Sequence, residues 1–354
     1  MTASATTVPP AGPAGEPLAQ RERACLLLGA LGDALGAPLE YLRIEEIRTA
    51  YGPQGLREPV RFNGRVGAIT DDTQMMLFTA EGLLDAIAGQ TDAASHGGPE
   101  FEAAVGAAYL RWLASQGLGD TRALVDPMGG PAGNPMSAPP RGLLALPEMR
   151  VQRAPSLTCL DALEAVQMPG QAAVNTRMGN IAAGRTAPVG VLFGSRITAA
   201  PQTEAETLAR CYSLASRLAR LTHGHPTAIH AAGAFATLIA ALLAGRSWDI
   251  ALARVDELLA AHPSASAVRE ALARAADATG AGDATTDPTV RLGEGWEAHE
   301  ALAIAVHVAR AASAPMAAPS AANHPADAGM SPSAAALLRA VNHSGDSDGC
   351  GLMT

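Results

Sequence analysis

Alanine is the feature of this chain that most constrains its fold. It accounts for about a fifth of the 354 residues, a share well above that of an ordinary protein. Alanine is the best helix former, whereas the β-branched and aromatic runs that mark strands are scarce, and aromatic residues make up only 3% of the chain. The sequence therefore predicts an all-α protein.

Apolar residues recur at helical spacing along most of the chain. Helices are predicted over 21–35, 72–88, 101–115, 157–166, 204–221, 227–244, 248–261, 266–279, 296–312 and 334–341, and a further helix is predicted to begin within 188–193.

One large domain accounts for most of the chain. Hydrophobic residues at 48% against charged residues at 17% supply enough apolar surface for a sizeable core. Residues 1–19 are predicted to be a disordered leader, which leaves 20–354 as the domain. Residues 126–140 and 313–332 are rich in proline and small residues and are predicted to be long irregular insertions. The most apolar stretch, 231–244, is shorter than the roughly 20 residues that cross a bilayer and is predicted to be a buried core helix.

Charge and residue usage exclude several kinds of function. The net charge is -9 and the chain has no lysine, whereas nucleic-acid binding favours a basic face. Schiff-base lysines and the phosphate-binding lysine of a P-loop are therefore excluded. The four cysteines are widely separated, which predicts reduced thiols and a cytoplasmic location. Neither a nucleic acid nor a membrane is expected as a partner, and the oligomeric state is left open.

Two pairs of aspartates lie where a loop is predicted to give way to a helix. Asp71 and Asp72 follow Thr70, and Asp346 and Asp348 form the second pair. Alone, each pair is explained by helix capping or a solvated turn, because acidic side chains favour a helix N-terminus. If the four carboxylates meet, they repel one another unless cations join them, which predicts a site for one or two divalent ions. Hard oxygen ligands suit magnesium or manganese better than zinc.

Histidines supply a third candidate cluster, His223-Gly224-His225. The pair could bind zinc, but cysteine partners at zinc-finger spacing are absent. The simpler explanation is a packed or hydrogen-bonded histidine at a corner between helices. His230, one helical turn further on, is expected to be a core residue.

Five short motifs follow one another along the chain. They are Gly29–Glu40 (GALGDALGAPLE), Thr70–Thr73 (TDDT), Leu221–Pro226 (LTHGHP), Leu292–Trp296 (LGEGW) followed by Glu300–Leu302 (EAL), and Asn342–Asp348 (NHSGDSD). In this order they resemble the ADP-ribosylglycohydrolase family, typified by the dinitrogenase-reductase-activating and ADP-ribosylarginine hydrolases.

The resemblance implies a single orthogonal multi-helix all-α domain with a central metal-binding cleft that holds two Mg²⁺ or Mn²⁺ ions. By the same resemblance Thr70, Asp71 and Asp72 bind the metals from one side, and Asp346 and Asp348 bind them from the other. The implied reaction cleaves the bond between the anomeric carbon of ADP-ribose and a side-chain atom and releases free ADP-ribose. Its partner is an ADP-ribosylated protein, most plausibly modified on arginine, or a small molecule that contains ADP-ribose.

Further site residues follow from the resemblance alone. Glu40 joins Asp71 and Asp346 as a catalytic candidate near the mouth of the site, although an exposed charge after Pro38 explains it equally well. Asp33 is expected to support the first helix. The resemblance also assigns residues to substrate binding, namely Gly179, Gly184, Arg185 and His223.

Two departures from the family pattern concern ligand contacts. Within Gly179–Pro188, Ile181 and Ala182 replace two glycines that let the backbone approach a nucleotide. Gly349 follows the last aspartate where the family has threonine or serine, which removes one hydroxyl ligand.

A third departure concerns the last motif. Family chains continue into a long apolar helix, whereas this sequence ends at Thr354. A helix of four or five residues has no stability of its own. Asp346 and Asp348 are therefore expected to be loosely held unless another element or subunit fills the groove.

Two functions stay open at this point. The intact acidic motifs favour a metal-dependent hydrolase. Gly349 and the short C-terminal segment favour a degenerate family member that binds ADP-ribose or an ADP-ribosylated partner, or that acts as an immunity-type interaction protein.

Overall fold

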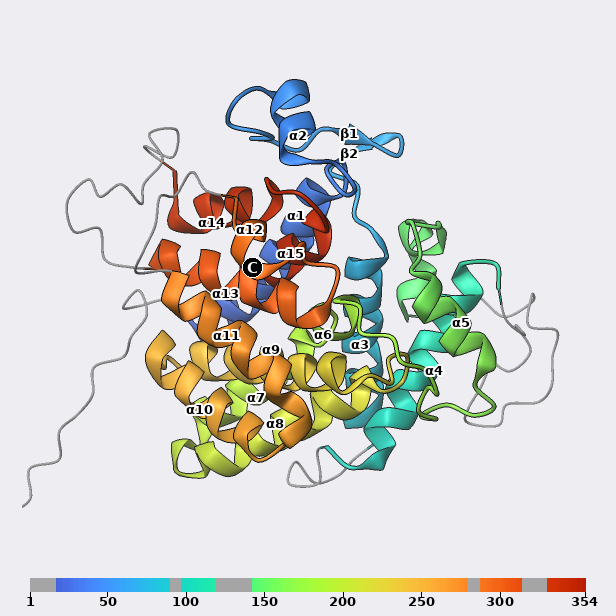
Figure 1. The fold of residues 1–354 in the computed structure, drawn as a ribbon. Coiled ribbons are helices and arrows are strands. Elements are labelled where there is room, and N and C mark those ends of the chain that lie inside the picture. Colours follow the sequence, from blue (N-terminus) through green and yellow to red (C-terminus); the bar gives the residue numbers. More distant parts are fainter. Residues whose placement is uncertain (1–16, 90–96, 119–141, 279–286, 314–329) are drawn as a thin grey trace, which may run out of the picture.

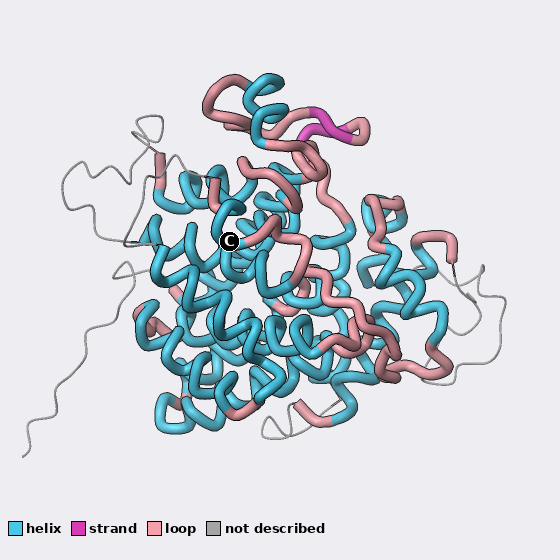
Figure 2. Tube along the Cα trace, in the orientation of Figure 1, coloured by secondary structure: helices cyan, strands magenta, loops and turns pink. Residues whose placement is uncertain are grey.

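The computed structural model describes residues 17–89, 97–118, 142–278, 287–313 and 330–354. These residues form helices joined by loops, together with one small hairpin (Figures 1 and 2). The prediction of an all-α protein is confirmed.

The elements follow one another as helices of varied length, with the hairpin near the beginning. The α-helices are α1 (Leu18–Gly36), α2 (Ile44–Tyr51), α3 (Asp71–Ala88), α4 (Pro99–Ser115), α5 (Leu157–Ala165), α6 (Ile181–Gly184), α7 (Ala187–Ala199), α8 (Glu204–Ala219), α9 (Pro226–Leu243), α10 (Trp248–Ala260), α11 (Ser266–Ala278), α12 (Thr289–Leu292), α13 (Ala298–Ser313), α14 (Pro332–Val341) and α15 (Ser347–Met353). The short 3-10 helices are η4 (Gly142–Ala145), η5 (Pro147–Arg150), η6 (Pro201–Thr203) and η7 (Pro263–Ala265), and the antiparallel strands are β1 (Arg61–Phe62) and β2 (Arg65–Val66).

The predicted helices match the observed ones closely, and the differences lie in short elements. Not predicted from the sequence were α2, α6, α12 and the β1–β2 hairpin, each of which spans eight residues or fewer. The predicted leader lies outside the described residues up to residue 16, and α1 begins at Leu18, inside the predicted leader. The predicted insertion 126–140 lies outside the described residues, as does most of 313–332.

Helix α9 forms the centre of the core. It carries no charged side chain, and most of its residues are buried against α7, α8 and α10 (Figure 1). Among the described helices, α9 is long and apolar enough to cross a membrane by length and composition, and 78% of its apolar window is buried inside the protein. Burial on all sides by other helices is what a core helix requires. The predicted core helix at 231–244 is part of it.

Glycines bring the backbones of α1 and α15 into contact. A Cβ atom on Gly32 would lie 2.0 Å from the carbonyl oxygen of Gly351, and one on Gly36 would lie 2.4 Å from the Cα of Asp348. Every residue of α15 is buried, and the helix lies along α1 (Figure 1). Of the two alternatives for the last motif, the structure shows the one in which another element supports it, because α1 provides the surface that stabilises a helix of only seven residues.

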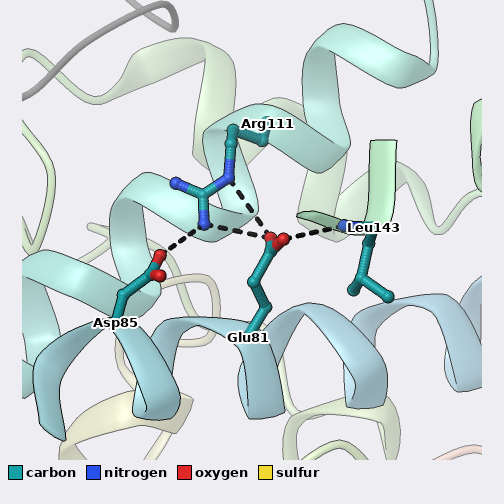
Figure 3. A network of polar contacts seen from close by, with 4 residues as sticks. All are labelled: Glu81, Asp85, Arg111 and Leu143. Carbon is teal, nitrogen blue, oxygen red and sulfur yellow. Dashed lines mark hydrogen bonds and ion pairs between the residues drawn. The ribbon is translucent and has the colours of Figure 1, made fainter. Parts of the chain in front are cut away.

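Charged side chains fasten α3 to its neighbours. Arg111 of α4 donates hydrogen bonds to Glu81 of α3 at 3.0 and 3.2 Å and to Asp85 at 2.8 Å (Figure 3). The backbone N–H of Leu143 in η4 donates to the other oxygen of Glu81 at 2.9 Å (Figure 3). These contacts fix the body of α3, whose N-terminus carries the first aspartate pair.

Candidate functional site

Three segments far apart in the sequence meet at one place. Glu40 follows the C-terminal end of α1, Asp71 and Asp72 begin α3, and Asp346 and Asp348 begin α15. The three helices pack on one another. The four aspartates are each less than a tenth exposed, and Glu40 is half-buried.

Asp33 of α1 fixes the start of α3. Its carboxylate accepts hydrogen bonds from the Thr70 backbone N–H at 3.0 Å and from the Thr70 hydroxyl at 2.9 Å. It also accepts from the backbone N–H and the hydroxyl of Thr73. Thr70 is the N-cap of α3, and its hydroxyl accepts the N–H of Asp72 at 3.3 Å. Asp33 therefore does more than support its own helix. The only sign of this in the sequence is a carboxylate on a glycine-rich, apolar helix.

The first aspartate of α3 is held from a second direction. The Asp71 carboxylate accepts the backbone N–H of Ser156 at 2.9 Å, and its own N–H donates to the carbonyl of Arg153 at 2.8 Å. The loop before α5 thus orients Asp71. Asp72 lies beside it at the helix N-terminus, where partial positive charge favours a carboxylate.

The carboxylates of Asp346 and Asp348 accept a hydrogen bond at the N-terminus of their own helix, α15. Asp346 is the N-cap of α15, and its carboxylate accepts the N–H of Gly349 at 3.0 Å. The Asp348 carboxylate accepts the same N–H at 3.1 Å. A Cβ on Gly349 would lie 2.2 Å from the Asn180 amide nitrogen. The departure at Gly349 therefore fits its surroundings, because Asn180 occupies the room that a threonine or serine side chain would need.

Burial raises the pKa of every carboxyl group in what we call the acidic cluster. The cluster consists of Asp33, Glu40, Asp71, Asp72, Asp346 and Asp348. The pKa reaches about 7 for Asp33 and about 6 for Asp348. After burial, the charges that act on these groups are those of the other carboxylates. Like charges gathered in a buried place are costly unless protons or cations neutralise them.

The metal-free protein is expected to lose stability as the pH rises. The pKa of Asp33 and of Asp348 is raised from an ordinary value of 3.8, so the folded chain binds more protons than the unfolded chain over the interval up to about pH 7. The stability that these bound protons supply is fully present below the pKa of the unfolded chain. It is lost as the pH rises through the pKa values of the folded chain. We expect the melting temperature in EDTA to fall between pH 5 and about pH 7.5. A melting temperature that rises steadily over this interval would contradict the raised pKa values.

The predicted substrate-binding segment lies against the last helix. A Cβ on Gly184 would lie 2.8 Å from a methyl carbon of Leu352 in α15. Ile181 and Ala182, which replace two family glycines, point into the core and are almost fully buried. The segment that carries Gly179 and Gly184 is thus adjacent to the helix that carries Asp348.

Gly179 and His223 are neighbours. A Cβ on Gly179 would lie 3.3 Å from Nε2 of His223. The His223 ring is fully buried, its Nδ1 lies 2.8 Å from the Thr222 hydroxyl, and its Nε2 has no hydrogen-bond partner among the described residues. Burial, followed by the charges of Arg185 and Arg177, holds the pKa of His223 well below its usual range. The ring is neutral, as expected for a packed histidine.

Arg185 is fully buried inside the helical core. Its guanidinium donates to the carbonyl oxygens of Leu218 and Ala219 at 3.2 and 3.3 Å and lies over the ring of Tyr109 at 4.7 Å. Both carbonyls also accept backbone N–H groups of the turn that follows α8, so Arg185 adds a second set of contacts at the end of this helix. The role of Arg185 in substrate binding stays a prediction.

A second group of potential metal ligands lies at the start of α13. One ligand atom from each of Glu297, His299 and Glu300 lies within 4.8 Å of the others. The Glu300 carboxylate, however, already accepts the backbone N–H groups of Glu297 and Gly295. These hydrogen bonds cap the N-terminus of α13 and order the loop before it.

Fold and site together define a class of protein: helical chains that collect buried carboxylates from several helix ends at one centre. The chain matches the model of the ADP-ribosylglycohydrolase family over residues 14–354. The chain therefore belongs to the ADP-ribosylglycohydrolase family.

Individual relatives are more distant. A protein of Archaeoglobus fulgidus described as uncharacterized is 41% identical over 69 residues, which is 19% of this chain and 23% of the relative. The chain thus spans less than a quarter of that relative's length. The solved structure of an ADP-ribosylglycohydrolase-related protein complex superposes with a TM-score of 0.53 at 24% identity, covering 95% of this chain and 85% of the other. That likeness is one of fold.

Proposed function

We propose that the chain is a metal-dependent glycohydrolase that releases ADP-ribose from ADP-ribosylated substrates, with ADP-ribosylarginine on proteins as the preferred class. One observation carries the proposal. Five buried carboxyl groups and the half-buried Glu40 come together from three helix ends, and the charges that act on them are mainly those of one another. Divalent cations relieve such repulsion, and an all-oxygen donor set fits Mg²⁺ or Mn²⁺.

The donor set divides between the two sides of the site. Asp71 and Asp72 with Thr70 would hold two ions from α3, and Asp346 and Asp348 would hold them from α15. Asp33 would keep Thr70 in place through the hydrogen bonds described above. When bound, the ions would polarise ribose hydroxyls and lower the pKa of a water molecule.

Glu40 is suited to move a proton. It is half-buried at the edge of the acidic cluster, and burial, together with the charge of Asp33, raises its pKa. A carboxyl group with a raised pKa exchanges protons nearer neutral pH than an ordinary glutamate does. We assign Glu40 as general acid or base, Asp71 and Asp346 as ligands that orient the reacting groups, and the segment with Gly179 and Gly184 as the approach for the nucleotide.

The test is the release of free ADP-ribose from an arginine-ADP-ribosylated protein. The purified chain is incubated with Mg²⁺ or with EDTA, beside an Asp346→Asn variant and a matched Asp161→Asn control on the exposed face of α5. Release that needs metal and Asp346, and that survives in the control, would support the hydrolase. A folded helical protein that releases nothing would support a degenerate ADP-ribose-binding or immunity-type member.

A further inference from the structure

A pair of stacked aromatic rings, one exposed and one half-buried, lies beside the acidic cluster. Tyr41 and Trp296 stack with ring centroids 5.1 Å apart and an interplanar angle of 26°. Tyr41 is 75% exposed, and its backbone φ is +69°. A large residue in the left-handed region costs about 1–3 kcal/mol and is often associated with a functional site. An exposed ring held in a strained conformation contributes little to core stability.

The two rings belong to segments on opposite sides of the site: Tyr41 lies next to α1, and Trp296 lies in a loop that contacts the start of α15. Tyr41 directly follows Glu40. On the other side, the carbonyl of Glu294 accepts the N–H of Asp346 at 2.9 Å. A Cβ on Gly345 would lie 2.2 Å from that same carbonyl oxygen, so the two loops are in backbone contact. The aromatic pair therefore spans the cluster from the α1 side to the α15 side.

Negative charge surrounds the pair. The indole N–H of Trp296 donates to the exposed Glu294 carboxylate at 3.3 Å. The charges that act on Tyr41 are those of Glu40, Asp346 and Asp348. The outer face of the stacked pair, with carboxylates at its edge, suits a planar cation, because the ring face and the carboxylates both attract it.

We infer that Tyr41, Trp296 and Glu294 form the subsite that binds the guanidinium leaving group of ADP-ribosylarginine. The inference rests on the proposed function and adds to it the residues that select the substrate. The guanidinium lies against the outer face of the stacked pair, with Glu294 as its anionic partner. A neutral leaving group, such as a serine hydroxyl, gains neither interaction.

Selectivity between two linkages tests the subsite. Kinetics are measured on an arginine-ADP-ribosylated peptide and on a serine-ADP-ribosylated peptide of the same charge. In Trp296→Leu and in Tyr41→Leu, kcat/KM for the arginine linkage is expected to fall about tenfold more than for the serine linkage. Tyr41→Phe keeps the aromatic face and should retain most of the preference for the arginine linkage over the serine linkage. Glu294→Gln should reduce the logarithm of this preference by about half. Equal losses on both linkages, as expected if the rings bind adenine, would overturn the inference, as would no loss on either.

A binding measurement separates this inference from the proposed function. If the wild-type protein cleaves neither linkage, the proposed function fails. The subsite is then judged by the fluorescence of Trp296, taken as wild type minus Trp296→Leu, during titration with methylguanidinium or with neutral methylurea. Quenching by methylguanidinium alone supports the subsite. An equal response to the two compounds, or none, overturns it.

Discussion

Asp72→Asn is expected to abolish turnover and, at the same time, to stabilise the metal-free protein. Burial and four neighbouring carboxylates raise the pKa of Asp72 well above its usual range, and no hydrogen bond from a described residue is among the causes that act on it. Asparagine keeps the shape and removes the charge. We expect turnover to fall about 10³-fold as a metal ligand is lost, and the free energy of unfolding in EDTA at pH 7.5 to rise by about 1–3 kcal/mol.

The two effects are measured on the same preparation. Activity is followed as ADP-ribose release, and stability is followed by chemical denaturation with and without Mg²⁺. Wild type should gain stability from Mg²⁺ through mass action, whereas the variant should gain little. Asp161→Asn serves as the control because Asp161 is exposed. An Asp72→Asn protein that is less stable than wild type in EDTA would argue against repulsion within the cluster.

Gly36→Ala is expected to disrupt the site at the contact between α1 and α15. The added Cβ would lie 2.4 Å from backbone atoms of Ser347 and Asp348, which cannot move aside as a flexible side chain can. The variant must push α15 away from α1 and displace Asp348. We expect a loss of about 3 kcal/mol in unfolding free energy and at least about a tenfold weaker metal affinity.

Gly89→Ala is the matched control for this prediction. Gly89 has a φ of -81°, and its added Cβ would meet its nearest atom at 3.7 Å. Alanine there should be neutral or slightly stabilising, because it restricts the unfolded chain. Unfolding by urea, compared for the two variants and wild type, gives the result. Equal stabilities for all three proteins would show that α1 and α15 do not pack through glycine.

The helices were predictable from the sequence because their signals are local. Alanine content and apolar spacing locate long helices such as α3 and α9 without knowledge of the fold. The four-residue α6 lacks a full apolar period, whereas α2 carries one over only eight residues, and tertiary contacts help to determine both. The seven-residue α15 shows the same effect, because its stability comes from α1 and not from its own sequence.

The site was predictable in part. Asp71, Asp72, Asp346 and Asp348 were expected to meet, and the structure gathers them. The contact between Asn180 and Gly349 could not be foreseen, since it joins residues far apart in the sequence.

The neighbours of the four aspartates were harder to anticipate. The link from Asp33 to Thr70 depends on how α1 and α3 pack. The stacking of Tyr41 on Trp296 depends on two loops that only the assembled fold brings together.

Titration of the metal-free protein with Mn²⁺ tests the central claim most directly, because it asks whether the acidic cluster holds cations at all. Binding is followed by calorimetry or by the electron paramagnetic resonance of free Mn²⁺, with wild type compared with Asp348→Asn and with the exposed Asp161→Asn control. We expect saturable binding of two ions per chain in wild type and in the control, and loss of binding in Asp348→Asn. Binding that is absent in wild type, or unchanged in Asp348→Asn, would contradict a metal centre built from these carboxylates.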